Sequence, residues 1–311
     1  MKLKNLALIG IGYWGKIHLK YLKKNKNVSV KKIFYNKNKQ VLNDNSLKKF
    51  NLTNNIKKIL TDDKIKFVDI VTPVHTHANL TLKFLKKNKT VLVEKPLLMT
   101  KKQETSIVNL QNKNNNLVVS YPYIFSKSLN YAKKIIETNK LGKLLYIETN
   151  IQQCGRFMKY GVNHLLAPHA ISAMSIFFDL KKINFLPKKI ISNNNNCETS
   201  LIICKKNNKF VGLIKLSLNY ASTHNNKIFT FYCDKGLIVC DLNNNKNTLL
   251  SYTYKRIKRK NFSIAKVKID KKKFFDEKNN MKLVINNFFS TKKNSKNFEL
   301  TKKINNFLKN E

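Results

Sequence analysis

The stretch that decides the fold is NLALIGIGYWG, residues 5–15. Its apolar start is typical of a buried β-strand, and Gly10, Gly12 and Gly15 follow with GxGxxG spacing before a helix-like segment, residues 16–24. The first glycine permits a tight turn, the second lets backbone approach a pyrophosphate, and the third lets helix and strand pack closely. Because the amino end of that helix faces the phosphates, the stretch predicts a dinucleotide-binding βαβ unit.

The end of the second predicted strand, residues 28–35, leaves the choice of dinucleotide open. An acidic residue at this point binds the ribose 2′-hydroxyl of NAD, but residues 35–39 read YNKNK. Asn36 can hydrogen-bond a ribose hydroxyl, whereas Lys37 and Lys39 can meet the 2′-phosphate of NADP or can simply be solvated loop charges. We therefore expect NAD or NADP as the cofactor.

A further apolar strand ends in a charged tripeptide. Residues 90–96 read TVLVEKP, and a strand that is apolar on both faces lies inside a parallel sheet. Such a strand delivers Lys95 to the carboxyl edge of the sheet, where α/β enzymes place their chemistry. An isolated tripeptide of this kind is more often a strand end that runs into a surface turn, but the upstream glycine loop favours a functional site.

Length and composition indicate two globular domains. With 311 residues and 42% apolar content, the chain can bury a sizeable core, and domains usually contain roughly 100 to 200 residues. Five cysteines without a CxxC pair predict reduced thiols and no metal site. The chain runs from Met1 directly into the first strand and has no apolar run of the roughly 18 residues that a membrane span needs. We expect a cytoplasmic protein without a membrane partner.

The net charge of +44 would ordinarily indicate a nucleic-acid partner. Nearly all of it comes from lysine spread from end to end, and the only arginines are Arg156, Arg256 and Arg259. A nucleic-acid binder more often uses arginine and gathers its charge on one face. Abundant lysine, asparagine and isoleucine fit A+T-rich codons instead. We expect no specific nucleic-acid partner and interpret residues 255–260 and 271–273 as exposed faces.

The pattern of elements divides the chain near residue 120. Before it, apolar strands alternate with amphipathic helices, which predicts a doubly wound, mostly parallel α/β sheet in a dinucleotide-binding Rossmann domain, residues 1–120. After it, period-2 patterns predict a C-terminal α+β domain with a largely antiparallel open sheet, residues 121–311, for substrate binding and oligomerisation. Helices are expected at 126–138 and 167–178, and strands at 143–153, 189–192, 199–205, 209–219, 227–233, 236–241 and 248–254.

Motifs in the first 180 residues resemble the Gfo/Idh/MocA oxidoreductase family. They are GIGYWG (10–15), TPVHTH (72–77), VLVEKP (91–96), LGK (141–143) and APH (167–169). Within the family, residues 121–125 and 163–172 are most similar to the nucleotide-sugar dehydrogenases of surface-polysaccharide synthesis. The resemblance implies an NAD(P)-dependent enzyme that transfers hydride between a sugar carbinol and nicotinamide. It also implies a sugar or nucleotide-sugar substrate and a homo-oligomer, either a dimer or a tetramer.

The resemblance assigns roles to individual residues. The glycine loop would hold the pyrophosphate, Thr72 and Pro73 would line the nicotinamide half, and Glu94 would hold the nicotinamide ribose. Lys95 would point at the reacting carbinol and share the proton handling with His169, whose imidazole titrates near working pH.

Three further residues, Tyr13, Trp14 and His77, are also counted with the cofactor site. Tyr13 and Trp14 belong to the glycine loop and are expected to pack on its helix. His75, in a loop, and His77, at a helix start near the cofactor, are expected to be structural, because such residues more often serve packing than catalysis.

One departure from the family pattern supports an alternative function. The family places an aspartate four residues before the pocket histidine and commonly another directly after it, but this chain has Leu165 and Ala170. A missing carboxylate removes an orienting and proton-accepting group, so that activity is reduced, rerouted to His164 or lost. The alternative is a noncatalytic dinucleotide-binding protein that acts as a sensor or subunit.

Overall fold

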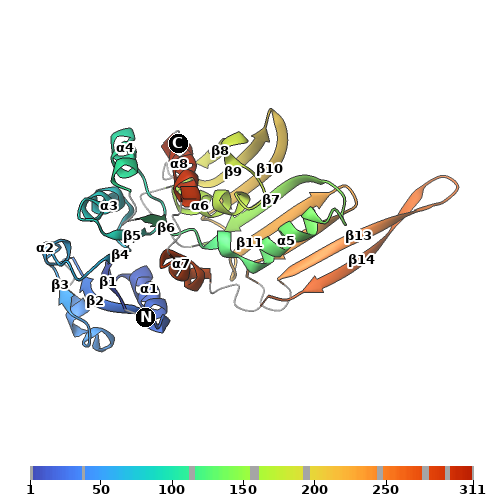
Figure 1. The fold of residues 1–311 in the computed structure, drawn as a ribbon. Coiled ribbons are helices and arrows are strands. Elements are labelled where there is room, and N and C mark those ends of the chain that lie inside the picture. Colours follow the sequence, from blue (N-terminus) through green and yellow to red (C-terminus); the bar gives the residue numbers. More distant parts are fainter. Residues whose placement is uncertain are drawn as a thin grey trace. The chain divides into compact units, whose positions relative to one another are not determined.

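The computed structural model describes residues 3–36, 39–111, 116–154, 161–191, 197–243, 248–274, 280–290 and 295–309. The chain forms two compact units, one of Met1–Tyr121 with Met281–Asn310 and one of Pro122–Asn280 (Figure 1). The first boundary between the units lies between Tyr121 and Pro122. The expected single C-terminal domain 121–311 differs from the structure, however, because its last part belongs to the first unit.

The first unit is a Rossmann fold, which confirms the predicted doubly wound parallel sheet. Its parallel strands lie in the order β3-β2-β1-β4-β5-β6. The strands are β1 (Lys4–Ile9), β2 (Val28–Phe34), β3 (Leu52–Thr53), β4 (Phe67–Ile70), β5 (Thr90–Val93) and β6 (Leu117–Val119). The helices are α1 (Tyr13–Lys24), α2 (Lys57–Leu60), α3 (His77–Leu85), α4 (Lys101–Leu110), α7 (Asn280–Phe288) and α8 (Ser295–Lys309). Leu6 to Ile9 and Val91 to Val93 are fully buried, as apolar strands inside a parallel sheet should be.

Helix α8 is tied to the first unit by two asparagines. The Asn297 amide accepts from the Val119 backbone N–H at 2.8 Å and donates to the Val119 carbonyl at 2.9 Å. Asn305 makes the same pair of bonds with Met99, both at 3.0 Å. The Asn297 amide thus satisfies backbone groups at the outer edge of β6, as another strand would, and the Asn305 amide does the same for the segment before α4. These contacts span 178 and 206 residues of sequence, so no local pattern could reveal them.

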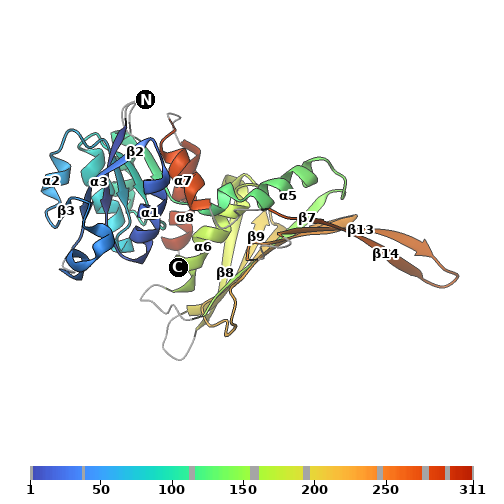
Figure 2. The same cartoon turned by 90° about the horizontal axis from the view of Figure 1, so that it is seen from below.

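The second unit is built on an eight-stranded sheet in the order β14-β13-β12-β11-β7-β10-β9-β8. All its pairings are antiparallel except β10 with β7, which confirms the predicted largely antiparallel sheet. The strands are β7 (Leu144–Gln152), β8 (Ile183–Ile191), β9 (Cys197–Lys206), β10 (Lys209–Ser217), β11 (Asn226–Cys233), β12 (Gly236–Asp241), β13 (Leu249–Lys258) and β14 (Ser263–Lys272). Helices α5 (Lys127–Glu137) and α6 (Val162–Met174) pack on this sheet (Figure 2).

Strand β14 is absent from the sequence-based prediction, and β13 is longer than predicted. The lysine runs at 255–260 and 271–273 were interpreted as exposed faces, and they are exposed, but most of their residues lie in these two strands. Ala265, Val267 and Ile269 alternate with charged residues along β14, a period-2 pattern that predicts a strand. The high lysine content concealed it.

The face of the second sheet that carries Tyr146 and Tyr232 presents aromatic side chains. These two rings stack at 4.3 Å between centroids, and Phe210 lies against Tyr146 at 5.4 Å. Phe210 is 46% exposed. The homo-oligomer expected from the family resemblance stays a prediction.

Candidate active site

Three neighbouring strands bring the predicted cofactor residues of the first unit to one edge of the sheet. Strand β1 pairs with β4, and β4 pairs with β5, all in parallel. The pairing continues beyond the strand ends, because Val71 N–H donates to the Ile9 carbonyl at 2.8 Å and Glu94 N–H donates to the Ile70 carbonyl at 2.9 Å. The glycine loop after β1, Thr72 and Pro73 after β4, and Glu94 and Lys95 after β5 are therefore neighbours at the carboxyl edge.

The three glycines of the loop meet different surroundings. Gly10 has a φ of +99°, and a Cβ placed on it would lie 2.3 Å from the Val71 carbonyl oxygen. A Cβ on Gly15 would lie 2.3 Å from the Gly10 oxygen, so both residues serve the close approach of loop, helix and strand. A Cβ on Gly12 would meet nothing within 4 Å. The space in front of Gly12, at the start of α1, fits a pyrophosphate seated against backbone.

This contrast predicts opposite phenotypes for two alanine substitutions. Gly15→Ala should lower the thermal stability of the cofactor-free protein, because the new Cβ would overlap the backbone of Gly10. Gly12→Ala should leave the free energy of unfolding within about 1 kcal/mol of wild type while weakening NADH binding by more than about tenfold. Thermal unfolding and a titration followed by NADH fluorescence measure the two effects. Wild-type NADH affinity in Gly12→Ala would show that the pyrophosphate does not lie against this residue.

The aromatic residues of the loop lie differently from expectation. Tyr13 and Trp14 were expected to pack on the helix, but they are 66% and 47% exposed and contact each other edge to face at 5.6 Å. The loop places them in the first turn of α1, where the core is already occupied by Gly15 and His18. Their side chains are therefore accessible beside the glycine loop.

The described residues at the end of β2, Tyr35 and Asn36, carry no carboxylate. Asn36 is exposed there, and Lys37 lies outside the described residues. The next acidic residue, Asp44, accepts hydrogen bonds from Lys16 Nζ at 2.6 Å and from Ser46, and the Lys16 contact is the main cause that lowers its pKa to about 2. Asp44 is thus paired with Lys16 at the start of α1 and with Ser46 in its own loop.

Thr72 and His77 belong to one hydrogen-bonded corner. The hydroxyls of Thr72 and Thr76 lie 2.6 Å apart, and Thr76 also donates to the Pro73 carbonyl at 2.7 Å. His77 is 1% exposed, with its ring nitrogens 3.0 Å from the Pro96 carbonyl oxygen and 2.7 Å from the Thr72 carbonyl oxygen. Burial lowers the pKa of His77 despite these bonds. His77 therefore links the segments after β4 and β5. It would influence a bound cofactor indirectly, by holding Thr72 and Pro96 in place.

A buried cluster that the sequence analysis did not identify lies directly behind Glu94. His18, from α1, stands between two carboxylates: its Nδ1 is 2.8 Å from Asp69 Oδ2 and its Nε2 is 3.1 Å from Glu94 Oε1. The side chains of His18 and Asp69 are fully buried, whereas that of Glu94 is 14% exposed. We call these three residues the His18 cluster.

The charges in the His18 cluster shift one another's pKa values. Burial alone would lower the pKa of His18, but the charge of Asp69 and hydrogen bonds to both carboxylates raise it to about 10. Burial raises the pKa of Asp69 more than the imidazolium lowers it. Burial would also raise the pKa of Glu94, but the hydrogen bond and charge of His18 outweigh it and lower this pKa. Glu94 is therefore the carboxylate that stays ionised.

Two sequence signals could have revealed the cluster. His18 lies on the buried stripe of α1 with Gly15, Leu19 and Leu22, a spacing at which an ionisable residue must find a partner inside the protein. Asp69 interrupts the otherwise apolar strand β4, and it too is fully buried. A buried base and a buried acid in adjacent elements predict an ion pair.

His169 lies in the second unit, in the interior of α6 rather than at the start of a helix. The sequence predicted this helix over residues 167–178, but it begins at Val162, includes Pro168 and ends at Met174. The His169 ring lies 5.0 Å from the ring of Tyr123. Leu165 lies one turn before His169, where the family carries an aspartate, and Ala170 is fully buried. His164 belongs to the same helix.

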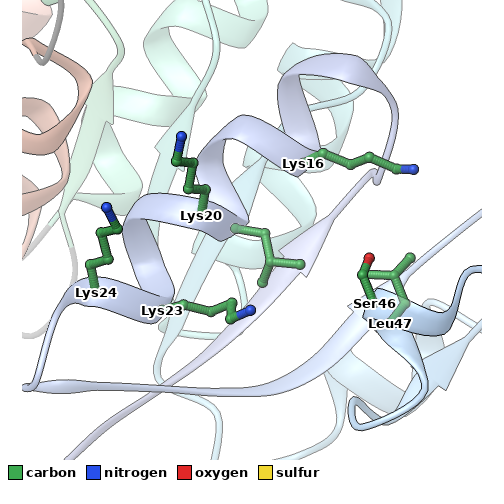
Figure 3. Close-up of a pocket in the computed structure, with 7 residues that line it drawn as sticks. Lys16, Lys20, Lys23, Lys24, Ser46 and Leu47 are labelled. Atoms are coloured by element: carbon green, nitrogen blue, oxygen red, sulfur yellow. The ribbon is translucent and has the colours of Figure 1, made fainter.

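A separate basic pocket of about 360 Å³ lies along α1. It is lined by Leu19, Leu47, Ser46 and four lysines, Lys16, Lys20, Lys23 and Lys24 (Figure 3). None of the predicted site residues lines it. Its lysines follow the general spread of positive charge over the chain, and strongly hydrated surface ammonium groups do not define a ligand.

Neither a metal site nor a membrane span is found in the described part of the chain. No group of three His, Cys, Asp or Glu side chains is arranged there to hold a metal ion. No helix within the described ranges is both long and apolar enough to cross a membrane.

Fold and site together define a Rossmann-type dinucleotide-binding protein. Residues 4–121 match the model of the oxidoreductase family with an NAD-binding Rossmann fold. This match to the Gfo/Idh/MocA family confirms the resemblance over residues 4–121, and it confirms the expected nicotinamide dinucleotide cofactor, NAD or NADP.

Curated relatives match about half of this chain. Levoglucosan dehydrogenase of Pseudarthrobacter phenanthrenivorans is 29% identical over 152 residues, which are 45% of this chain and 39% of the relative. An uncharacterized oxidoreductase of Streptococcus pneumoniae is 22% identical over 144 residues, 46% of this chain and 39% of the relative. The chain thus matches well under two thirds of the length of each relative.

Solved structures share the fold over nearly the whole chain. KijD10, a 3-ketoreductase from Actinomadura kijaniata in complex with NADP and TDP-benzene, superposes with a TM-score of 0.81 at 12% identity, covering 99% of this chain and 96% of that one. Levoglucosan dehydrogenase in complex with NADH gives a TM-score of 0.80 at 17% identity, covering 99% and 95%. At these identities the likeness establishes the two-unit fold and no more.

Proposed function

We propose that the protein is an NAD(P)-dependent oxidoreductase that interconverts a sugar carbinol and the corresponding ketone, with Lys95 and His169 handling the proton. The bound nicotinamide supplies the hydride chemistry. In the oxidative direction the carbinol loses hydride to the nicotinamide and its hydroxyl proton to a protein base, and reduction reverses both transfers.

The observation that carries this proposal is the place of Lys95. It follows Glu94 at the carboxyl edge, beside the segment after β4, which is itself the neighbour of the glycine loop. A dinucleotide whose pyrophosphate lies at Gly12 has its nicotinamide half directed along this edge. An ammonium group there stabilises the alkoxide that develops on the substrate oxygen and donates or receives its proton.

The substrate class rests on the relatives and on charge. Relatives and structural neighbours include a levoglucosan dehydrogenase and a 3-ketoreductase whose structure contains TDP-benzene. A net charge of +44 would also attract an anionic substrate, which favours a nucleotide-linked sugar over a neutral one. We therefore propose a nucleoside-diphosphate sugar as the substrate.

Leu165 favours a second function, noncatalytic dinucleotide binding. One turn before His169, an aspartate would accept a proton or orient the imidazole, and leucine does neither. In that case the first unit still binds the cofactor, and the protein serves as a sensor or a subunit.

A two-stage experiment separates the two functions. The purified full chain is first titrated with NADH and with NADPH by fluorescence, and then assayed by nicotinamide absorbance, in both directions, with free sugars and nucleoside-diphosphate sugars. We expect binding of a reduced cofactor and turnover of at least one nucleotide-linked sugar. Tight cofactor binding without turnover of any sugar would support the noncatalytic function instead, and absence of cofactor binding would contradict both.

A further inference from the structure

We infer that His18, supported by Asp69, is a positioning residue of the nicotinamide site, because it holds the Glu94 carboxylate ionised and fixed in orientation at the carboxyl edge. The inference rests on the proposed function, in which Glu94 holds the nicotinamide ribose. It adds two residues, from α1 and β4, that lie behind the edge and that no sequence motif assigned to the site.

The sheet register places the three residues of the His18 cluster side by side. Asp69 is paired in register with Leu92, and Glu94 lies two residues beyond Leu92, directly after the end of β5, so that Asp69 and Glu94 project from the same face of the sheet. His18 lies between them, with one ring nitrogen toward each carboxylate. The side chains of His18 and Asp69 are fully buried, whereas that of Glu94 is partly exposed. Of these three residues, Glu94 is therefore the one that can contact a bound molecule.

The number of protons in the cluster follows from these contacts. A neutral imidazole has one donor, so it cannot satisfy two ionised carboxylates at once. Both contacts are satisfied when one additional proton is present, either on the imidazole or on one of the carboxyl groups. Since the surroundings raise the pKa of Asp69 and lower that of Glu94, this proton resides on His18 or Asp69. Glu94 remains an acceptor.

An ionised, immobilised Glu94 suits the task proposed for it. A ribose hydroxyl donates its hydrogen bond to a carboxylate more strongly than to a neutral carboxyl group. His18 holds Oε1 of Glu94 at 3.1 Å, which limits the rotation of the side chain. Lys95 directly follows Glu94 in the chain. Holding Glu94 in one orientation therefore also helps to hold the Lys95 ammonium group in position. The other titratable groups whose charges act with that of Glu94 are Asp69, His77, Lys95 and Tyr121.

Two substitutions of His18 separate a positioning role from a purely structural one. The amide of His18→Asn reaches the position of Nδ1 and keeps only the contact to Asp69, whereas that of His18→Gln reaches the position of Nε2 and keeps a donor toward Glu94. His224→Gln, at an exposed histidine of the second unit, is the matched control. Each variant is combined with Glu94→Gln, and the Kd for NADH is measured by fluorescence together with thermal unfolding.

We expect His18→Asn to raise the Kd for NADH about tenfold at neutral pH and His18→Gln to raise it less. In the Glu94→Gln background, His18→Asn should have no further effect on Kd. Without His18, burial raises the pKa of Glu94, so the defect of His18→Asn should grow between about pH 8 and about pH 6, over which wild-type binding stays level. His224→Gln should bind like wild type.

Wild-type NADH affinity in His18→Asn, or an equal defect with and without Glu94→Gln, would overturn the inference. If His18→Asn does not fold, His18→Gln decides through the same pH dependence and the same coupling to Glu94. Sugar turnover by wild type together with unaffected His18 variants would refute only the positioning role. A wild-type protein that binds neither NADH nor NADPH would refute the proposed function and this inference together.

Discussion

Replacing Lys95 with alanine is expected to lower kcat for the sugar substrate by at least about a hundredfold while changing the Kd for NADH by less than about threefold. The reason is that Lys95 acts on charge that develops in the transition state, whereas the dinucleotide is held by the glycine loop and Glu94. An interaction made only in the transition state lowers kcat and kcat/KM equally when it is removed. Steady-state kinetics by nicotinamide absorbance and NADH fluorescence measure the two quantities.

Two further variants sharpen the Lys95 experiment. Lys95→Met keeps the length of the side chain without its charge and should be as inactive as Lys95→Ala. Lys101→Ala, at a lysine whose side chain is 84% exposed at the start of α4, should behave as wild type. Turnover by Lys95→Ala at the wild-type rate would exclude Lys95 from the chemistry. An equal loss of NADH binding and turnover would show instead that Lys95 serves the cofactor.

The cofactor half of the site was predictable because its signals are local. GIGYWG follows a strand directly, and Glu94 and Lys95 follow another, so each motif lies within a few residues of the element that positions it. Parallel pairing of β1, β4 and β5 then brings the motifs together without further information. The doubly wound parallel sheet of the first unit was therefore predictable from short apolar runs and glycine spacing, whereas its strand order was not predicted.

What the sequence did not reveal depends on contacts between distant residues. His18 meets partners 51 and 76 residues away, and the Asn297 and Asn305 amides meet backbone about 200 residues away. The chemical types of these residues allow such hydrogen bonds, but they do not determine which distant residue is the partner. Helix α6 illustrates a local error, since the sequence predicted its start at residue 167 and the helix begins five residues earlier, at Val162.

Removing the carboxylate of Asp69 is expected to lower the free energy of unfolding by about 3 kcal/mol or more at neutral pH. Asp69→Asn keeps the shape of the side chain but leaves the His18 imidazolium, fully buried, with Glu94 as its remaining carboxylate. The matched control is Asp62→Asn, whose Oδ2 lies 2.7 Å from Lys32 Nζ, nearly the 2.8 Å that separates Asp69 from His18. Because the Asp62 pair is partly exposed, its loss should cost only about 0–1 kcal/mol.

The stabilisation that Asp69 provides should also depend on pH in a defined direction. Since the pKa of His18 is raised from 6.5 to about 10 in the folded protein, its contribution is complete below about pH 6.5 and is lost as the pH rises through about 10. The stability difference between wild type and Asp69→Asn should therefore shrink by up to about 1.4 kcal/mol for each pH unit in the upper part of that range. Urea unfolding followed by circular dichroism measures this difference. Two outcomes would contradict a buried imidazolium held by Asp69. One is a stability difference between wild type and Asp69→Asn that increases with pH, and the other is a difference no larger than that between wild type and Asp62→Asn.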